Sequence, residues 1–214
     1  MIAILRVVSL NCNGLGDKLK RKKLFRHLTR RNADVILLQE THTTDDTSKA
    51  FKSEWKRLRR GHFSVWNSGT SRSCGVAVLL RNKTTTKVID SSHDAEGRVL
   101  TLQVLINDDV FQFVSVYAPN APGSRPLFFE NLDEHLFPDG DTLVGGDFNM
   151  VEDIQLDRSG GTPNSAHEKG KVELNQVKLD NDLVDIWRKN SPTAREYTWS
   201  SGNRLIHSRI DLHV

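Results

Sequence analysis

The chain has 214 residues, of which 37% are hydrophobic, and its formal net charge is +3. This length fits one large domain or two small ones, and the apolar content is too high for a disordered chain. Cys12 and Cys74 form no CxxC motif, which argues against a disulfide framework and a Cys-based zinc site, and no apolar run reaches the roughly 18 residues of a membrane helix.

Seven segments predict strands, because they alternate apolar and polar residues or run apolar between turn residues. In chain order they are 4–10, 35–38, 74–80, 99–106, 111–117, the run that ends at Asp147, and 210–212.

Three apolar stripes at helical spacing predict helices. They are Leu24, Phe25 and Leu28 in a helix over 18–31; Phe128, Leu132 and Leu136; and Leu174, Val177, Val184 and Trp187 in one helix that Pro192 ends. The polar stretch 157–171 predicts a surface loop. Together these elements predict one mixed α/β domain over 1–214, with two sheets packed face to face and helices outside.

Two basic runs, KLKRKK at 18–23 and KRLRR at 56–60, stand out from the near-neutral composition. Such runs can neutralise nucleic-acid phosphates, and a solvated helix face explains them equally well.

Five polar residues stand at or just beyond the ends of predicted strands: Asn13, Glu40, Tyr117, Asp147 and Asn149. Ligand sites in layered α/β folds form there, because loops bring polar groups over a rigid base. A carboxylate that ends a buried strand is partly desolvated, and Mg²⁺ is a natural partner for it. Each residue also has a structural explanation, such as a turn at Asn13–Gly14, so the pattern alone leaves both interpretations open.

A series of segments in this order resembles the endonuclease domain of non-LTR (LINE-type) retrotransposons: LNCNGL, DVILLQETH, SGTSRSCGVAVL, GRVLTLQV, VYAPN, LVGGDFNMVED, DRSGG, LVDIWR, YTW and SRID. That group belongs to the endonuclease/exonuclease/phosphatase superfamily, which includes exonuclease III-like AP endonucleases and pancreatic deoxyribonuclease. The resemblance covers nearly the whole chain. It implies a four-layer α/β sandwich of two packed mixed β-sheets flanked by helices (DNase I-like), and hydrolysis of a DNA phosphodiester with Mg²⁺ or Mn²⁺.

The resemblance also implies a role for each motif residue. Glu40 would bind the metal with Asn13 near metal and phosphate, and Asp147 would orient or deprotonate the attacking water. Asn149 would donate to the phosphoryl oxygen, and Tyr117 would direct its hydroxyl at the same phosphate. Asp211 would hold the other site residues in place without binding the metal itself. This division agrees with phosphodiester chemistry, in which a metal neutralises charge and neutral donors stabilise the transition state.

We expect double-stranded DNA as the partner, contacted by loops whose recognition depends on DNA shape. The candidate DNA-binding residues are Thr198, Arg125, Arg158, Ser159, Arg204 and Arg209. For Arg204 and Arg209 a surface-solubility role is an equal alternative. The resemblance further implies a monomer that acts in the nucleus, fused to a reverse transcriptase in an intact element.

The family's last motif, a Ser-Asp-His, follows SRID, but this sequence ends three residues after Asp211. His207 and His213 do not match that motif. We therefore expect the final strand and its histidine to be missing, the fold and metal site to persist, and cleavage to be weak, since acid–base help contributes about 10²–10⁴-fold.

Three functions follow from these observations. The first is an endonuclease that nicks target DNA to prime reverse transcription. The second is an inactive remnant that still binds duplex DNA through its basic runs and loops. The third is another phosphoesterase of the superfamily, acting on inositol lipids or nucleotides, and the retrotransposon-type motifs count against it.

Overall fold

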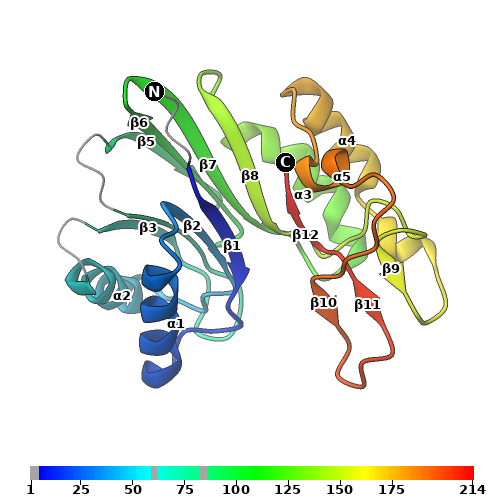
Figure 1. The fold of residues 1–214 in the computed structure, drawn as a ribbon, viewed down its shortest axis with the longest axis horizontal. Coiled ribbons are helices and arrows are strands. Elements are labelled where there is room, and N and C mark those ends of the chain that lie inside the picture. The colour runs from blue at the N-terminus through cyan, green and yellow to red at the C-terminus, as the bar shows by residue number, and fades with distance from the viewer. Residues whose placement is uncertain (1–4, 59–61, 82–85) are drawn as a thin grey trace. The chain divides into compact units, whose positions relative to one another are not determined.

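The computed structural model describes residues 5–58, 62–81 and 86–214 (Figure 1). Residues 1–4 and 59–60, which carry parts of the first predicted strand and of the second basic run, lie outside this range. The chain divides into two compact units. Unit 1 comprises Met1–Tyr117 and His135–Gly146, and unit 2 comprises Ala118–Glu134 and Asp147–Val214.

The first sheet of unit 1 has the order β1-β2-β4-β3. Its strands are β1 (Val7–Asn11), β2 (Val35–Gln39), β3 (Phe63–Asn67) and β4 (Val76–Leu80). β1 and β2 are parallel, with Val7 opposite Val35, and β4 is antiparallel to both β2 and β3. Because β1 and β2 are parallel, their carboxyl ends lie at the same edge of the sheet.

The second sheet of unit 1 contains β5 (Thr86–His93), β6 (Val99–Ile106), β7 (Asp109–Tyr117) and β8 (Asp141–Asp147), in that order. The β5–β6 and β6–β7 pairs are antiparallel, and a bulge interrupts the first pair between Val88 and Asp90.

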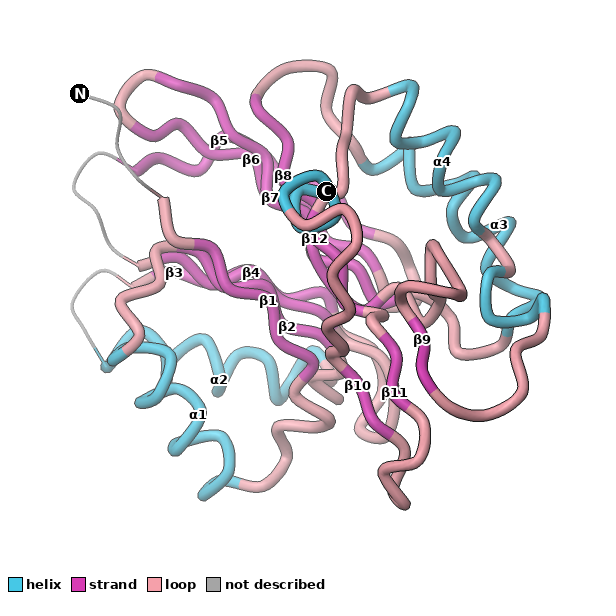
Figure 2. Tube along the Cα trace, turned by 45° about the vertical axis from the view of Figure 1, so that its right-hand side comes forward, coloured by secondary structure: helices cyan, strands magenta, loops and turns pink. Residues whose placement is uncertain are grey.

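Alternate side chains of β2 explain why its apolar run is continuous. Ile36 and Leu38 belong to the core beneath the helices, whereas Val35 and Leu37 belong to the core between the two sheets. Because side chains alternate across a strand, a strand buried on both faces has no polar positions. Figure 2 shows helices on one side of the first sheet and the second sheet on the other.

Helices α1 (Lys18–Arg30) and α2 (Asp45–Leu58) cover the outer face of the first sheet. Asp17 caps α1, since its Oδ1 accepts from Lys20 N at 2.7 Å. Phe25 and Trp55 join the two helices edge to face, with ring centroids 5.4 Å apart. The sequence prediction missed α2, although acidic residues in its first turn and basic residues in its last are a helix signal.

Unit 2 contains the three-stranded sheet β10-β11-β9, made of β9 (Arg158–Ser159), β10 (Trp199–Ser200) and β11 (His207–Ser208), and the short strand β12 (Asp211–His213). Its helices are α3 (Arg125–Glu130), α4 (Lys171–Asp180) and α5 (Ile186–Asn190), with 3₁₀ turns at Pro122–Ser124, Asn131–His135 and Ser165–Glu168. Phe129 stacks on Phe148 with ring centroids 6.0 Å apart, which ties α3 to the GGDFN segment.

The structure confirms most predicted elements and corrects several. The stripe Phe128, Leu132 and Leu136 is not one helix, because α3 ends at Glu130 and the 3₁₀ turn Asn131–His135 follows. All seven predicted strands are present, but β3 and β5 were missed, and β5 is mostly exposed and therefore lacks a clear pattern. The predicted third helix is two helices, because Asp182 has a φ of 52° and the Asp185 carboxylate starts α5 by accepting from Arg188 N. The predicted loop 157–171 contains β9 and a 3₁₀ turn.

None of the helices in the described part of the chain is both long enough and apolar enough to cross a membrane.

Candidate active site

The backbone is left-handed at three of the residues that the sequence placed after strand ends. The φ angles are 43° at Asn13, 48° at Glu40 and 51° at Asn149. Non-glycine residues seldom adopt this conformation, and where they do, the surrounding structure has to hold them there, often at functional sites.

Glu40 follows β2 in unit 1, and its carboxylate is bound by a side chain from β1. Asn11 Nδ2 donates to Glu40 Oε1 at 2.9 Å, while Asn11 Oδ1 accepts from Asn13 N at 3.0 Å. His42 Nε2 lies 3.6 Å from Glu40 Oε2. Asn11 therefore links the two predicted metal-site residues, Asn13 and Glu40. The sequence prediction missed Asn11, although it lies two positions before Asn13 in the same LNCNG motif.

The donor set around Glu40 fits a hard divalent cation. The Glu40 side chain is 20% exposed, so its oxygens can reach a ligand as well as Asn11. Mg²⁺ takes oxygen ligands, is held in proteins by one or two carboxylates and keeps several waters. Among the described residues no three His, Cys, Asp or Glu side chains gather as a ligand cluster. Glu40 would supply a carboxylate of unit 1 to such an ion, with the amide of Asn11 beside it.

Tyr117 ends β7 and is 6% exposed. Its backbone N–H donates to Arg98 O at 2.8 Å, and the Arg98 guanidinium lies 5.4 Å from the centre of its ring. Arg98 thus holds Tyr117 at both its backbone and its ring.

In unit 2, Asp147 and Asn149 lie together at the end of the GGDFN segment. Asp147 is 5% exposed, and its Oδ1 accepts from Asn149 N at 2.9 Å. Asn149 Nδ2 donates to Ala118 O at 2.8 Å and to Asn120 Oδ1 at 2.7 Å. Asn120, the last residue of VYAPN, is a second partner that the sequence prediction missed.

Asp211 and Thr198 also come together in unit 2. Thr198 Oγ1 accepts from the backbone N–H groups of Ile210 and Asp211, at 3.1 and 3.2 Å. Burial raises the pKa of the Asp211 carboxyl, although Thr198 and His213 act in the opposite direction. Burial lowers the pKa of His213, again partly offset by Asp211. Through its two hydrogen bonds, the Thr198 hydroxyl holds the backbone of the SRID segment.

Arg209 of the SRID motif is buried among carboxylates and is 3% exposed. Its Nε lies 2.7 Å from Asp157 Oδ1, and its Nη1 lies 2.7 Å from Asp185 Oδ2. Arg188 adds a short ion pair to Asp157. Burial alone would raise the pKa of Asp157, but its hydrogen bonds with Arg209 and Arg188 leave that pKa lowered. Arg209 therefore forms ion pairs inside unit 2, and its predicted contact with a DNA phosphate stays a prediction.

Arg125 is a second predicted DNA contact that the structure places inside unit 2. It is 5% exposed and donates to three backbone carbonyls: Pro119 O at 3.0 Å, Asn120 O at 2.9 Å and Ala166 O at 3.0 Å. Burial lowers its pKa. Its guanidinium holds the segment around Asn120, and its predicted contact with DNA stays a prediction.

The other predicted DNA-binding residues lie at or near the surface of unit 2. Arg158 is half-buried, and its Nη1 donates to Ser208 Oγ at 3.0 Å. Ser159 is exposed and pairs with His207 in the small sheet. Arg204 is exposed in the turn between β10 and β11, with a φ of 56°. Arg158 and Ser159 form β9 of the sheet β10-β11-β9, and Arg204 lies in the turn between its other two strands.

Comparisons with known sequences identify the family of this chain. Residues 8–213 match the sequence profile of the Endonuclease/Exonuclease/phosphatase family. The chain is 30% identical over 212 residues to the transposon TX1 uncharacterized 149 kDa protein of Xenopus laevis, which covers 97% of this chain but only 16% of that protein.

Solved structures show the same fold. An AP endonuclease from Archaeoglobus fulgidus matches with a TM-score of 0.76 at 19% identity, over 98% of this chain and 86% of that one. The endonuclease domain of TRAS1, a telomere-specific non-LTR retrotransposon, matches with a TM-score of 0.65 at 15% identity, over 98% of this chain and 83% of that one. The fold class is therefore the DNase I-like α/β sandwich that the sequence predicted.

Proposed function

This chain belongs to the endonuclease/exonuclease/phosphatase family, and on that basis we propose that it is a metal-dependent endonuclease that hydrolyses a phosphodiester of DNA. Family membership by itself indicates a nuclease or phosphodiesterase. In this proposal the chain nicks target DNA to prime reverse transcription. The similarity to the TX1 transposon protein and to the structure of a retrotransposon endonuclease domain supports this role. In this proposal the DNA is double-stranded, the chain acts as a monomer in the nucleus, and the reverse transcriptase belongs to the same longer protein.

The observation that carries the proposal is the environment of Glu40. Its left-handed backbone and its bond from Asn11 keep a partly exposed carboxylate at the end of a buried strand. Such an arrangement has an energetic cost, of about 1–3 kcal/mol for each strained residue. A role in binding a cation accounts for both the strain and the exposure.

Each residue has a role that its surroundings support. When bound at Glu40, Mg²⁺ or Mn²⁺ would neutralise phosphate charge and polarise the ester. Asp147 accepts hydrogen bonds and can take a proton from water, while Asn149 and Tyr117 are neutral donors that add no charge. Asn11 and Arg98 hold Glu40 and Tyr117 in place.

The test is nicking of supercoiled plasmid by the purified chain with Mg²⁺. We expect nicking that EDTA abolishes and that is lost in Glu40→Ala and Asp147→Ala. Asp46→Ala is the matched control, because Asp46 is a carboxylate with 96% exposure and no place in the site. Absence of nicking by a folded chain that still binds duplex DNA would reject the enzyme and favour the DNA-binding alternative.

A further inference from the structure

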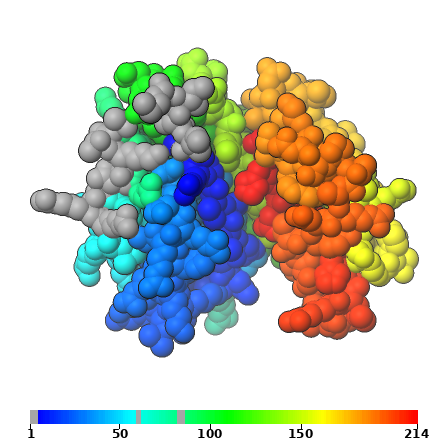
Figure 3. Space-filling view, in the orientation of Figure 1, coloured from blue at the N-terminus to red at the C-terminus, as the bar shows by residue number. Residues whose placement is uncertain are grey.

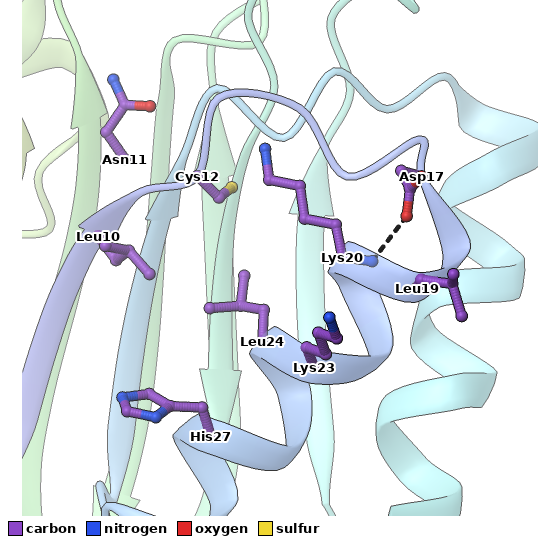
Figure 4. A pocket seen from close by; sticks show the side chains of 9 residues that line it. All are labelled: Leu10, Asn11, Cys12, Asp17, Leu19, Lys20, Lys23, Leu24 and His27. Carbon is purple, nitrogen blue, oxygen red and sulfur yellow. Dashed lines mark hydrogen bonds between the residues drawn. The ribbon is translucent and has the colours of Figure 1, made fainter.

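A groove of about 800 Å³ lies between α1 and the neighbouring strand β1 in unit 1. Figure 4 shows Leu10 and Cys12 on the strand side, and Lys20, Lys23 and His27 on the helix side. Figure 3 shows residues of α1, in blue, at the surface of unit 1. Of the lining residues, only Asn11 belongs to the candidate metal site described above.

One wall of the groove carries basic side chains. Lys20, Lys23 and His27 follow one another at three- and four-residue spacing, so they share a face of α1, and all three are exposed. The helix itself contains no acidic residue over 18–30. The single carboxylate of the lining is Asp17, which is engaged in capping the helix. The groove therefore offers cations to a polyanion.

The floor of the groove is apolar. Leu10 is 36% exposed on β1, and Leu24 of α1 packs only partly against the core beneath the helices. An exposed and a half-buried leucine beside two lysines suit a ligand that combines charge with flat apolar surface. A single-stranded nucleic acid has this chemistry, because its bases are unstacked and its phosphates remain accessible. A duplex hides its base faces and would present only phosphates to Leu10 and Leu24.

We propose that this groove binds single-stranded nucleic acid, with phosphates at Lys20 and Lys23 and bases over Leu10 and Leu24. This site is separate in its chemistry from the proposed nuclease reaction, since it needs neither a metal nor Asp147. It gives the chain a means to hold a free strand.

The experiment measures anisotropy of labelled oligothymidylate and oligouridylate with the full chain in EDTA, over a range of salt concentrations. Lys23→Glu/His27→Gln alters the groove wall without touching Lys20, whose Nζ donates to Asn13 O at 2.6 Å. Lys22→Glu is the control matched in charge, because Lys22 is exposed on the same helix but does not line the groove. Plasmid nicking is measured for both variants.

We expect the groove variant to weaken single-strand binding by about tenfold. The log–log salt slope should fall by about 0.7 for each phosphate that the variant no longer neutralises. The control variant should retain most of the affinity, and both variants should nick plasmid as the parent chain does. Tighter binding of one oligonucleotide identifies RNA or DNA as the ligand, and either result supports the site.

An equal decrease in affinity for the two variants would overturn the proposal, because it would show diffuse attraction by the whole helix. So would displacement of the oligonucleotide by polyglutamate at equal charge concentration, which would point to an acidic peptide, or equal affinity for a duplex. Binding is measured in EDTA, and nicking is measured separately with Mg²⁺. A failure of nicking therefore leaves the binding result interpretable.

Discussion

Asn149 has both of its side-chain N–H groups engaged, by Ala118 O and by Asn120 Oδ1. To donate to a phosphoryl oxygen it has to release one of these acceptors. Asn120 is the one that can yield, because it is an exposed side chain, whereas the Ala118 carbonyl is part of the buried backbone.

We therefore expect Asn149→Ala to lower kcat by about 10²–10³-fold, the usual effect of removing one transition-state donor. Asn120→Ala should lower kcat by less than about tenfold, because the Asn149 amide keeps its hydrogen bond to Ala118 O and so its orientation. Single-turnover nicking rates measure both effects, and thermal unfolding controls for stability. Rate decreases of equal size would assign Asn120 a direct role at the phosphate.

Asp157 contributes a stability that depends on pH. Its pKa is lowered in the folded chain despite burial, because Arg209 and Arg188 bind the ionised form. A carboxyl with a depressed folded pKa contributes stability above its unfolded pKa of about 3.9 and loses it as pH falls through the folded value.

Urea unfolding of Asp157→Asn should accordingly show a large deficit at neutral pH, of about 3–5 kcal/mol for an unpaired buried partner. The deficit should narrow as the pH falls from about 3.9, where the Asp157 carboxyl of the unfolded chain becomes protonated, through the lower pKa of the folded chain. A deficit that stays constant across this range would mean that Asp157 contributes through packing alone.

At the scale of elements, Gly146 is required by the pairing of β7 and β8. A Cβ at this position would lie 1.9 Å from Val116 O and 2.8 Å from Val116 C. Both atoms are backbone, so the two strands would have to separate. The second glycine of GGDFN is therefore needed for strand packing, which the motif alone does not reveal.

Gly146→Ala should destabilise the chain by about 1–3 kcal/mol or more, as overpacking does. Gly123→Ala is the control, since a Cβ there meets no atom within 4 Å. Thermal unfolding compares the two. A Gly146→Ala chain as stable as the control would show that the strands can separate at little cost.

At the scale of the whole chain, metal binding should be visible without any substrate. A ligand that binds only the folded state adds stability, about 2.7 kcal/mol at a concentration 100 times its Kd. We expect Mg²⁺ or Mn²⁺ to raise the unfolding temperature of the parent chain and of Asp46→Asn, but not of Glu40→Gln. An equal shift in all three would place the ion elsewhere.

The sequence by itself determined the strands and the residues that follow them. Val35 to Leu38 are apolar at every position because both faces of β2 are buried, and that property is local to the strand. The same locality placed Glu40 and Asp147 at strand ends. The prediction from local pattern was wrong for the third helix, because the left-handed backbone at Asp182 ends the first of two helices. It missed β5, because a mostly exposed strand has no apolar pattern.

Only the tertiary structure decided which groups meet. Asn11 binds Glu40 from 29 positions away, and Arg209 binds Asp157 across 52. A periodic pattern shows which face of an element is buried. A hydrogen bond or ion pair depends on which segments, far apart in the sequence, the fold brings together. For that reason the sequence predicted Arg125 and Arg209 as cations for DNA, and the fold uses them to hold its own carbonyls and carboxylates.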